Sequence, residues 1–123
     1  VGMSSILLGL LWYIHELYGR YEVFEDELDR RWGFLLADGG GLAAPVWLGE
    51  FGTDTDSLWW QHTLRYLEER EVDWAYWSFN GERKGNMTET FGILADDAKT
   101  VRHPWKLKAL QRVMNASIAP RGP

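Results

Sequence analysis

The sequence has no cysteine among its 123 residues, which excludes a disulfide framework, a thiol nucleophile and a cysteine-rich metal site. It has only three histidines, and they show no metal-ligand spacing. We therefore expect no metal and no other cofactor. The one long apolar run, residues 6–14, has nine residues, whereas a membrane-spanning helix needs ~20. We expect no membrane span, and we interpret this run as a buried strand or the start of a helix rather than a targeting segment.

The chain also lacks an excess of positive charge. Its net charge is −5, and no run of lysine and arginine occurs in it. A nucleic-acid partner is therefore not expected, because phosphate neutralisation supplies most of the non-specific affinity of such proteins. The length allows one small domain, since compact domains commonly have ~100–150 residues. An apolar fraction of 46% with 25% charged residues excludes a collagen-like or charge-driven disordered chain.

Aromatic residues are what the chain has in abundance. They make up 15% of the sequence and include eight tryptophans, five tyrosines and five phenylalanines. Such a content indicates either a dense aromatic core or an aromatic-lined ligand site. The position of each aromatic residue in the sequence pattern has to show whether it belongs to a core or to a ligand site.

Hydrophobic spacing predicts three helices and two strands. Helices are expected over residues 22–38 and 58–70 and from His103-Pro104 onward, and strands over residues 44–52 and 72–79. The first helix should end at Asp38 and the three glycines after it, and residues 80–87 should form a polar loop. The expected inward side chains are Phe24, Leu28, Trp32, Leu35 and Leu36 in the first helix, Trp60, Leu64 and Leu67 in the second, and Leu107, Leu110, Val113 and Met114 in the last. His62 and His103 are expected to be helical and structural.

The order of these elements indicates an α/β fold. The strand over residues 44–52 is apolar without alternation, which is typical of a strand buried on both faces and hence of a parallel sheet. Strand, helix and strand in succession form a βαβ unit. A complete (β/α)8 TIM barrel takes roughly 250 residues and eight strands, so this chain would hold only about its last third.

Two side chains lie at the carboxyl ends of the predicted strands, where parallel α/β folds bind substrates. Glu50 has no packing reason to follow an apolar strand, so it is the best catalytic candidate; the alternative is an anion at the N-terminus of the next helix. Trp77 could stack its indole on the apolar face of a pyranose ring. The alternative, a core tryptophan, fits Trp74 better.

Three segments carry a resemblance to glycoside hydrolase family 5, the cellulase family. They are Pro45-Val-Trp-Leu-Gly-Glu-Phe-Gly52, Asp73-Trp-Ala-Tyr-Trp-Ser-Phe-Asn-Gly81, and Glu89-Thr-Phe-Gly-Ile-Leu94 leading into Thr100-Val-Arg-His-Pro104. The resemblance covers residues 20–114, approximately, and is specific in the order and spacing of the motifs. It implies an incomplete TIM barrel, from about the sixth or seventh strand to the eighth helix, within a single partial catalytic domain over residues 1–123. Residues 1–20 are a divergent segment and residues 119–123 a frayed tail.

The resemblance also implies a chemistry. Family members are secreted, extracellular retaining hydrolases of β-glucans or related polysaccharides, and Glu50 matches their nucleophile and Trp77 their sugar-stacking residue. His15, three residues before Tyr18, is the nearest match to a cleft histidine of the sixth strand; the alternative, a half-buried structural histidine, explains it better. Asn80 and Glu82 are expected sugar contacts from the loop after the eighth strand.

The family's acid/base is the glutamate of an Asn-Glu-Pro motif, and this motif does not occur in the chain. Glu16, Glu82 and Glu89 are conceivable replacements, of which Glu82 fits best, although a solvated loop carboxylate explains it as well. We therefore expect the chain alone to be nearly inactive. The alternatives are a non-catalytic sugar-binding remnant, a half barrel completed by a partner, or an unrelated α/β protein. An open sheet edge should also favour self-association.

Overall fold

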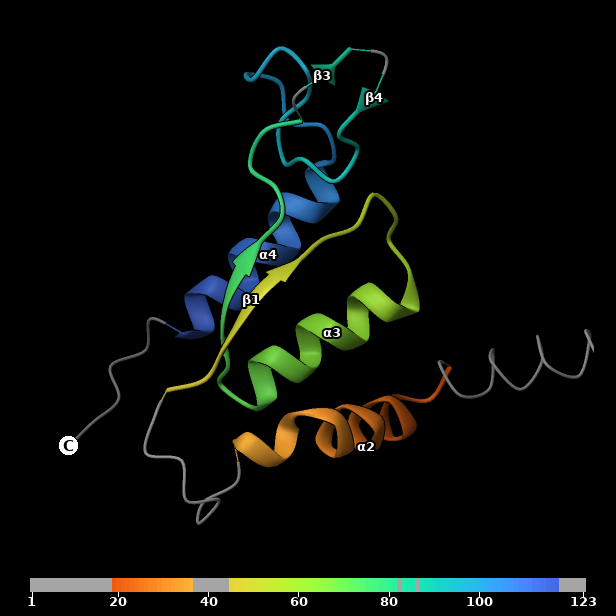
Figure 1. The fold of residues 1–123 in the computed structure, drawn as a ribbon, viewed down its shortest axis with the longest axis vertical. Helices are drawn as coiled ribbons and strands as arrows, with labels where there is room; N and C mark the ends of the chain where they lie inside the picture. Colours follow the sequence, from red (N-terminus) through yellow and green to blue (C-terminus); the bar gives the residue numbers. More distant parts are fainter. Residues whose placement is uncertain (1–18, 37–44, 82, 86, 118–123) are drawn as a thin grey trace, which may run out of the picture. The chain divides into compact units, whose positions relative to one another are not determined.

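The structure is a computed structural model that describes residues 19–36, 45–81, 83–85 and 87–117 (Figure 1). The chain divides into two units, residues 1–43 and 44–123. The apolar run over residues 6–14, the glycine stop after Asp38 and the tail from residue 119 lie outside the described residues. So do two of the predicted site residues, His15 and Glu82.

The described part of the first unit is one helix and a short turn. Helix α2 spans Tyr21–Arg31 and is followed by the 3-10 helix η1, Gly33–Leu35. The prediction of a helix to Asp38 is therefore wrong at its C-terminal end, because Trp32, with φ −151° and ψ −18°, leaves the helical region. Tyr21 and Phe24 are the buried side chains of α2. Of the inward residues expected here, Phe24 is buried, whereas Leu28 and Trp32 are only half-buried.

The second unit is built on the predicted βαβ order. Its elements are β1 (Trp47–Phe51), α3 (Leu58–Glu69), β2 (Asp73–Tyr76), β3 (Arg83–Lys84), β4 (Met87–Thr88) and α4 (Pro104–Ser117). In Figure 1, β1 and β2 lie side by side and α3 connects the far end of one to the start of the other. The unit is thus a mixed α/β structure with a short sheet.

The sheet is parallel, as the sequence predicts. Strand β1 pairs with β2 in the register Trp47 to Asp73, Leu48 to Trp74 and Phe51 to Tyr76, with an irregularity between Leu48 and Phe51. The pairing therefore brings the carboxyl ends of both strands to the same edge of the unit. The predicted site residues Glu50 and Trp77 lie at these ends.

Helix α3 begins where the polar loop before it predicts. The Ser57 hydroxyl accepts a hydrogen bond from the Trp60 N–H at 3.3 Å, which satisfies one of the free donors of the first turn. Trp60, Leu64 and Leu67 are all buried, so the predicted inward stripe is confirmed. The stripe holds α3 against the sheet.

An aromatic cluster forms the core between the sheet and its two helices. The Phe51 ring lies 5.9 Å from the Trp60 ring, 5.7 Å from Trp74 and 5.6 Å from Tyr76. Trp60 also contacts Trp105 of α4 at 6.0 Å between ring centroids. Because Phe51 and Tyr76 both face these rings, α3 and α4 cover the same face of the two-stranded sheet. Part of the aromatic content of the chain therefore forms this core.

Several sequence predictions about burial are wrong. Strand β1 is not buried on both faces, since only Phe51 is buried and Trp47 is 62% exposed. Within the described residues, β1 and β2 pair only with each other. Met114 is half exposed rather than inward, because Leu110 and Val113 already fill the buried side of α4. His103 lies before α4 and is not helical.

The predicted polar loop after β2 contains a short antiparallel ribbon. Strands β3 and β4 pair through Arg83 with Thr88 and Lys84 with Met87. Two-residue strands carry too little hydrophobic alternation to be recognised in a sequence. Beyond the ribbon, the chain returns to the end of the sheet, where Leu94 N–H donates to Phe79 O and Gly81 N–H donates to Leu94 O, both at 2.9 Å.

Candidate functional site

The candidate site begins where the two strands end. The Trp77 N–H donates to the Phe51 carbonyl at 2.8 Å, which continues the ladder one residue beyond β2. Glu50 immediately precedes Phe51 in β1. Parallel pairing therefore brings the backbones of Glu50 and Trp77 to neighbouring strands at the same end of the sheet.

Both side chains are accessible at this end of the sheet. The rings of Phe51 and Tyr76, which are paired across the two strands, point toward the aromatic core under α3. Glu50 lies within the register irregularity between Leu48 and Phe51 and is exposed. The Trp77 side chain is 48% accessible.

A glycine allows the two strand ends to approach closely. A Cβ atom on Gly52 would lie 2.0 Å from the Trp77 carbonyl oxygen and 3.2 Å from the Phe91 ring. Any larger residue at this position would push the loop after β1 away from the end of β2. Gly52 therefore fixes how near the segment carrying Glu50 comes to the segment carrying Trp77.

The Glu50 carboxylate is available for chemistry. Within the described ranges, no hydrogen bond or ion pair reaches it, and its side chain is exposed. The carboxylate is therefore accessible to a ligand at this end of the sheet.

The Trp77 indole, by contrast, is held in place. Its Nε1–H donates to Glu89 Oε2 at 3.1 Å, and the other oxygen of the same carboxylate, Oε1, accepts the Phe91 N–H at 2.7 Å. The side chain is therefore both partly exposed and fixed, which is the geometry of a flat stacking surface.

A buried polar network holds the segment that contains Glu89 and Phe91. The Tyr76 hydroxyl lies 2.8 Å from the Phe91 carbonyl oxygen and 3.1 Å from that of Thr53, and it accepts the Thr53 N–H at 3.4 Å. Lys106 Nζ donates to the same Phe91 carbonyl at 2.8 Å, and this lysine has no exposed surface. Phe91 therefore connects β2, α4 and the loop after β1.

Burial changes the titration of both side chains in the network. It raises the pKa of Tyr76 to about 12, with the carboxylates of Glu89 and Asp54 adding to the effect. It lowers the pKa of Lys106 from 10.5 to about 8, an effect that Asp54 opposes and Arg102 strengthens. Tyr76 therefore remains a neutral hydroxyl at neutral pH, and Lys106 is a buried amine close to losing its proton.

The third predicted contact, Asn80, lies in the segment after Trp77. Asn80 is exposed and forms an isolated bridge with Leu94, and its carbonyl accepts the Ser78 hydroxyl at 2.8 Å. A Cβ on Gly92 would lie 2.4 Å from the Gly81 nitrogen. The backbone around Gly92 therefore packs directly against the backbone around Gly81. The backbone of this loop is thus ordered at the open end of the sheet.

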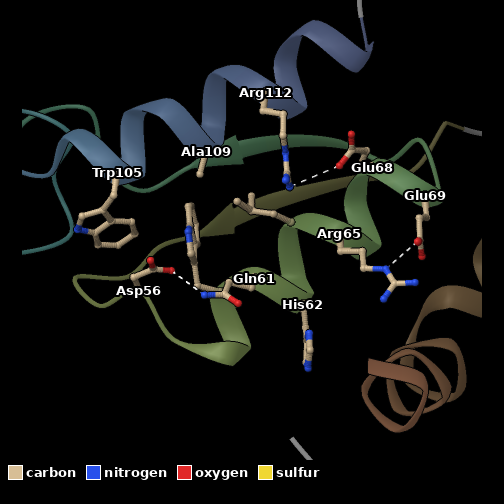
Figure 2. Close-up of a pocket in the computed structure, with 11 residues that line it drawn as sticks. Asp56, Gln61, His62, Arg65, Glu68, Glu69, Trp105, Ala109 and Arg112 are labelled. Atoms are coloured by element: carbon tan, nitrogen blue, oxygen red, sulfur yellow. Dashed lines mark hydrogen bonds and ion pairs between the residues drawn. The ribbon is translucent and has the colours of Figure 1, made fainter. Parts of the chain in front are cut away.

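The second unit also contains a groove that lies away from Glu50 and Trp77. It is an open groove of about 810 Å³ between α3 and α4, and Trp60 and Trp105 are among the residues that line it; Figure 2 shows the groove and its lining side chains. Figure 2 shows that its charged side chains pair with one another: Arg65 with Glu69 at 2.7 Å and Arg112 with Glu68 at 3.5 Å. Neither Glu50 nor Trp77 lines it. The charges of these four side chains are therefore compensated within the groove.

In the described part of the chain, no three side chains of the metal-ligating types come together. No helix described is both long and apolar enough to cross a membrane.

Sequence reasoning did not identify the supporting residues of the site. Glu89 was considered only as a replacement acid, whereas its two oxygens accept N–H donors. Lys106 was overlooked although its spacing gives a signal: it precedes Leu110 by four residues and Val113 by seven, which is the period of the buried stripe of α4. A lysine in that register is expected to be buried.

Comparison with known proteins agrees with the resemblance in the sequence. The chain is 28% identical over 108 residues to a protein of Chamaecyparis obtusa named as a glycosyl hydrolase 5 family protein. The match covers 74% of this chain and 19% of that protein, so the chain spans about a fifth of the length of the relative it matches. No family model matches the chain, and neither does a solved structure. The similarity supports a distant relationship to glycoside hydrolases of family 5.

Proposed function

We propose that this chain carries the nucleophile and the sugar platform of a retaining glycoside hydrolase that acts on a β-glucan or related polysaccharide. The observation that carries the proposal is that Glu50 and Trp77 lie on adjacent parallel strands at the same end of the sheet, both of them exposed. The family 5 name of the relative supports the reaction class. His15, Asn80 and Glu82 are proposed as further sugar contacts.

The proposed reaction proceeds in two displacements. The Glu50 carboxylate attacks the anomeric carbon, the bond to the leaving oxygen breaks, and a glycosyl ester forms; water then cleaves the ester and frees Glu50. Trp77 would hold the sugar ring by its apolar face while this happens. An exposed carboxylate and a hydrogen-bonded indole at the same end of two adjacent strands suit these roles.

The reaction needs a second carboxyl group, ~5–5.5 Å from the first, to protonate the leaving oxygen. No Asn-Glu-Pro motif occurs in the sequence. We therefore propose that the acid/base comes from another segment or chain, and that this chain alone turns over natural substrates slowly, since general acid catalysis supplies ~10²–10⁴-fold.

The missing acid motif favours a second candidate as well. The chain would then be a sugar-binding remnant, or a half barrel that a partner completes. In the described residues β1 and β2 leave their outer edges unpaired, and this supports association through the sheet. Binding without turnover in every preparation would favour this candidate over the hydrolase.

The test is a screen of soluble glucans and mannans with this chain and with a longer product of the same locus that contains an Asn-Glu-Pro segment. We expect both to bind sugar and only the longer one to hydrolyse it well. In the longer protein, Glu50→Gln should abolish turnover and leave binding largely intact. Full activity of this variant would remove Glu50 from the mechanism.

A further inference from the structure

The segment after β4 contains one carboxylate whose role the proposed reaction does not explain, that of Glu89. We propose that Glu89 is a positioning residue that fixes the Trp77 indole, so that a sugar meets the ring face and not the indole N–H. This inference rests on the proposed function. It starts from the hydrogen bond between Trp77 Nε1 and Glu89 Oε2, 3.1 Å long.

Glu89 can restrain the indole because Glu89 is itself restrained. Its Oε1 accepts the Phe91 N–H at 2.7 Å, so both oxygens of the carboxylate are engaged and the side chain cannot rotate freely. The Phe91 carbonyl, in turn, accepts the buried Lys106 amine and lies within hydrogen-bond distance of the Tyr76 hydroxyl. The restraint on Trp77 therefore runs from an exposed ring to side chains anchored in the core.

The hydrogen bond has a consequence for recognition. An indole has a single N–H donor, and in Trp77 this donor is already used. A sugar hydroxyl that competed for it would have to displace Glu89. The indole therefore presents only its ring face, and the chemistry it recognises is the C–H face of a pyranose ring, by stacking rather than by a hydrogen bond.

The same geometry distinguishes positioning from acid catalysis. An acid donates a proton to the leaving oxygen, whereas both Glu89 oxygens act as acceptors for N–H groups of the protein. A positioning role requires an acceptor oxygen at this place and no transferable proton. Glutamine retains one such oxygen and leucine retains none, so the two substitutions separate the two roles.

The experiment compares Glu89→Gln, Glu89→Leu and a matched control, Thr90→Ala, in the full chain. Thr90 lies next to Glu89, and its hydroxyl donates to Asp54 at 2.9 Å without touching Trp77. The first readout is hydrogen exchange of the Trp77 indole N–H, followed by ¹⁵N NMR and assigned from its loss in Trp77→Phe. The second is binding of a β-linked glucan oligosaccharide or, if that does not bind, a mannan oligosaccharide, by calorimetry.

We expect Glu89→Leu to speed indole exchange and to weaken sugar binding about five-fold, the effect of losing one modest hydrogen bond. Glu89→Gln should lie between Glu89→Leu and the unchanged chain, and Thr90→Ala should match the unchanged chain in both readouts. Melting curves identify any variant that is unfolded, and in that case the folded Glu89→Gln variant decides on the same two readouts.

Two results would overturn the inference. If indole exchange and sugar affinity in Glu89→Leu equal those of the unchanged chain, Glu89 does not position Trp77, although the proposed function stands. In the longer, active protein, a Glu89→Gln variant that binds sugar normally but loses turnover would assign Glu89 as the acid instead. If the unchanged chain binds no sugar, the proposed function fails, and the exchange rates alone decide whether Glu89 holds the indole.

Discussion

Replacing Lys106 with methionine tests the buried network beneath the site. The lysine has no exposed surface, its amine donates to the Phe91 carbonyl, and it lies 5.6 Å from the Tyr76 ring centroid and 5.8 Å from that of Trp105. Methionine has a similar length and carries no charge. The substitution therefore removes the proton-binding group and leaves most of the packing in place.

The structure gives the size and the sign of the expected effect. Burial lowers the pKa of Lys106 from 10.5 to about 8, a difference of about 2.5 in pKa. At ~1.4 kcal/mol for each pKa unit, the buried charge costs on the order of 3 kcal/mol. Between pH 8 and 10.5 the unfolded chain binds more protons than the folded one, so the free energy of unfolding rises with pH across this window. The contribution is lost as the pH falls through about 8.

The assay is urea unfolding of the unchanged chain and of Lys106→Met, followed by circular dichroism from about pH 7 to about pH 10.5 at one protein concentration. The unchanged chain should gain stability relative to Lys106→Met by ~2–3 kcal/mol over this range. Lys108, an exposed lysine of the same helix, provides the control. Lys108→Met should follow the unchanged chain at every pH.

A difference in unfolding free energy between the unchanged chain and Lys106→Met that stays constant over this range would refute the reasoning. It would mean that the Lys106 amine is hydrated in solution and that its hydrogen bond to the Phe91 carbonyl does not keep it buried. Tyr76, whose pKa burial raises to about 12, lowers the stability of both proteins above about pH 10 and therefore does not disturb the comparison.

Four further substitutions test separate parts of the account. Gly52→Ala should lower the free energy of unfolding by ~1–3 kcal/mol, because its Cβ would lie 2.0 Å from the Trp77 carbonyl oxygen; unchanged urea unfolding would contradict that close approach. Ser57→Ala should lower it by ~1 kcal/mol through loss of the helix cap, and an equal midpoint would count against the cap. Trp77→Ala should weaken sugar binding, whereas Glu50→Gln should leave it within about two-fold of the unchanged chain by calorimetry; the reverse order would exchange their proposed roles.

Local patterns in the sequence predicted the elements of the second unit well. Period and capping identified α3, because Ser57 and the stripe of Trp60, Leu64 and Leu67 are all local signals. The apolar run ending in Glu50 predicted a parallel strand, and the observed pairing with β2 agrees. These features are set by residues within one or two turns of each other.

The burial predictions failed where they depended on distant partners. An apolar strand such as β1 indicates two covered faces, yet only one face meets helices in the described structure. The end of α2 was missed because the apolar period continues through Leu35, whereas the backbone turns at Trp32. Hydrophobic pattern shows what a segment can bury, and tertiary structure decides what it does bury.

The candidate site was only half accessible to sequence reasoning. Glu50 lies near the carboxyl end of β1 and Trp77 directly after β2. Because the carboxyl ends of parallel strands meet at one edge of a sheet, the sequence predicts that these two residues lie at the same edge. Their supports could not be found this way, because Glu89 is twelve residues from Trp77 and Lys106 fifteen from Phe91. These contacts form through loops whose path no short-range pattern predicts.

The most direct test of the central claim is covalent trapping of the proposed nucleophile. The reagent is a fluorinated glycoside whose nitrophenolate leaving group departs without an acid, so the missing acid/base does not matter. We expect mass spectrometry to find the sugar on the peptide that contains Glu50, much less of it in Trp77→Ala, and none in Glu50→Gln. No labelling of the unchanged chain, or the same labelling in Glu50→Gln, would contradict the account.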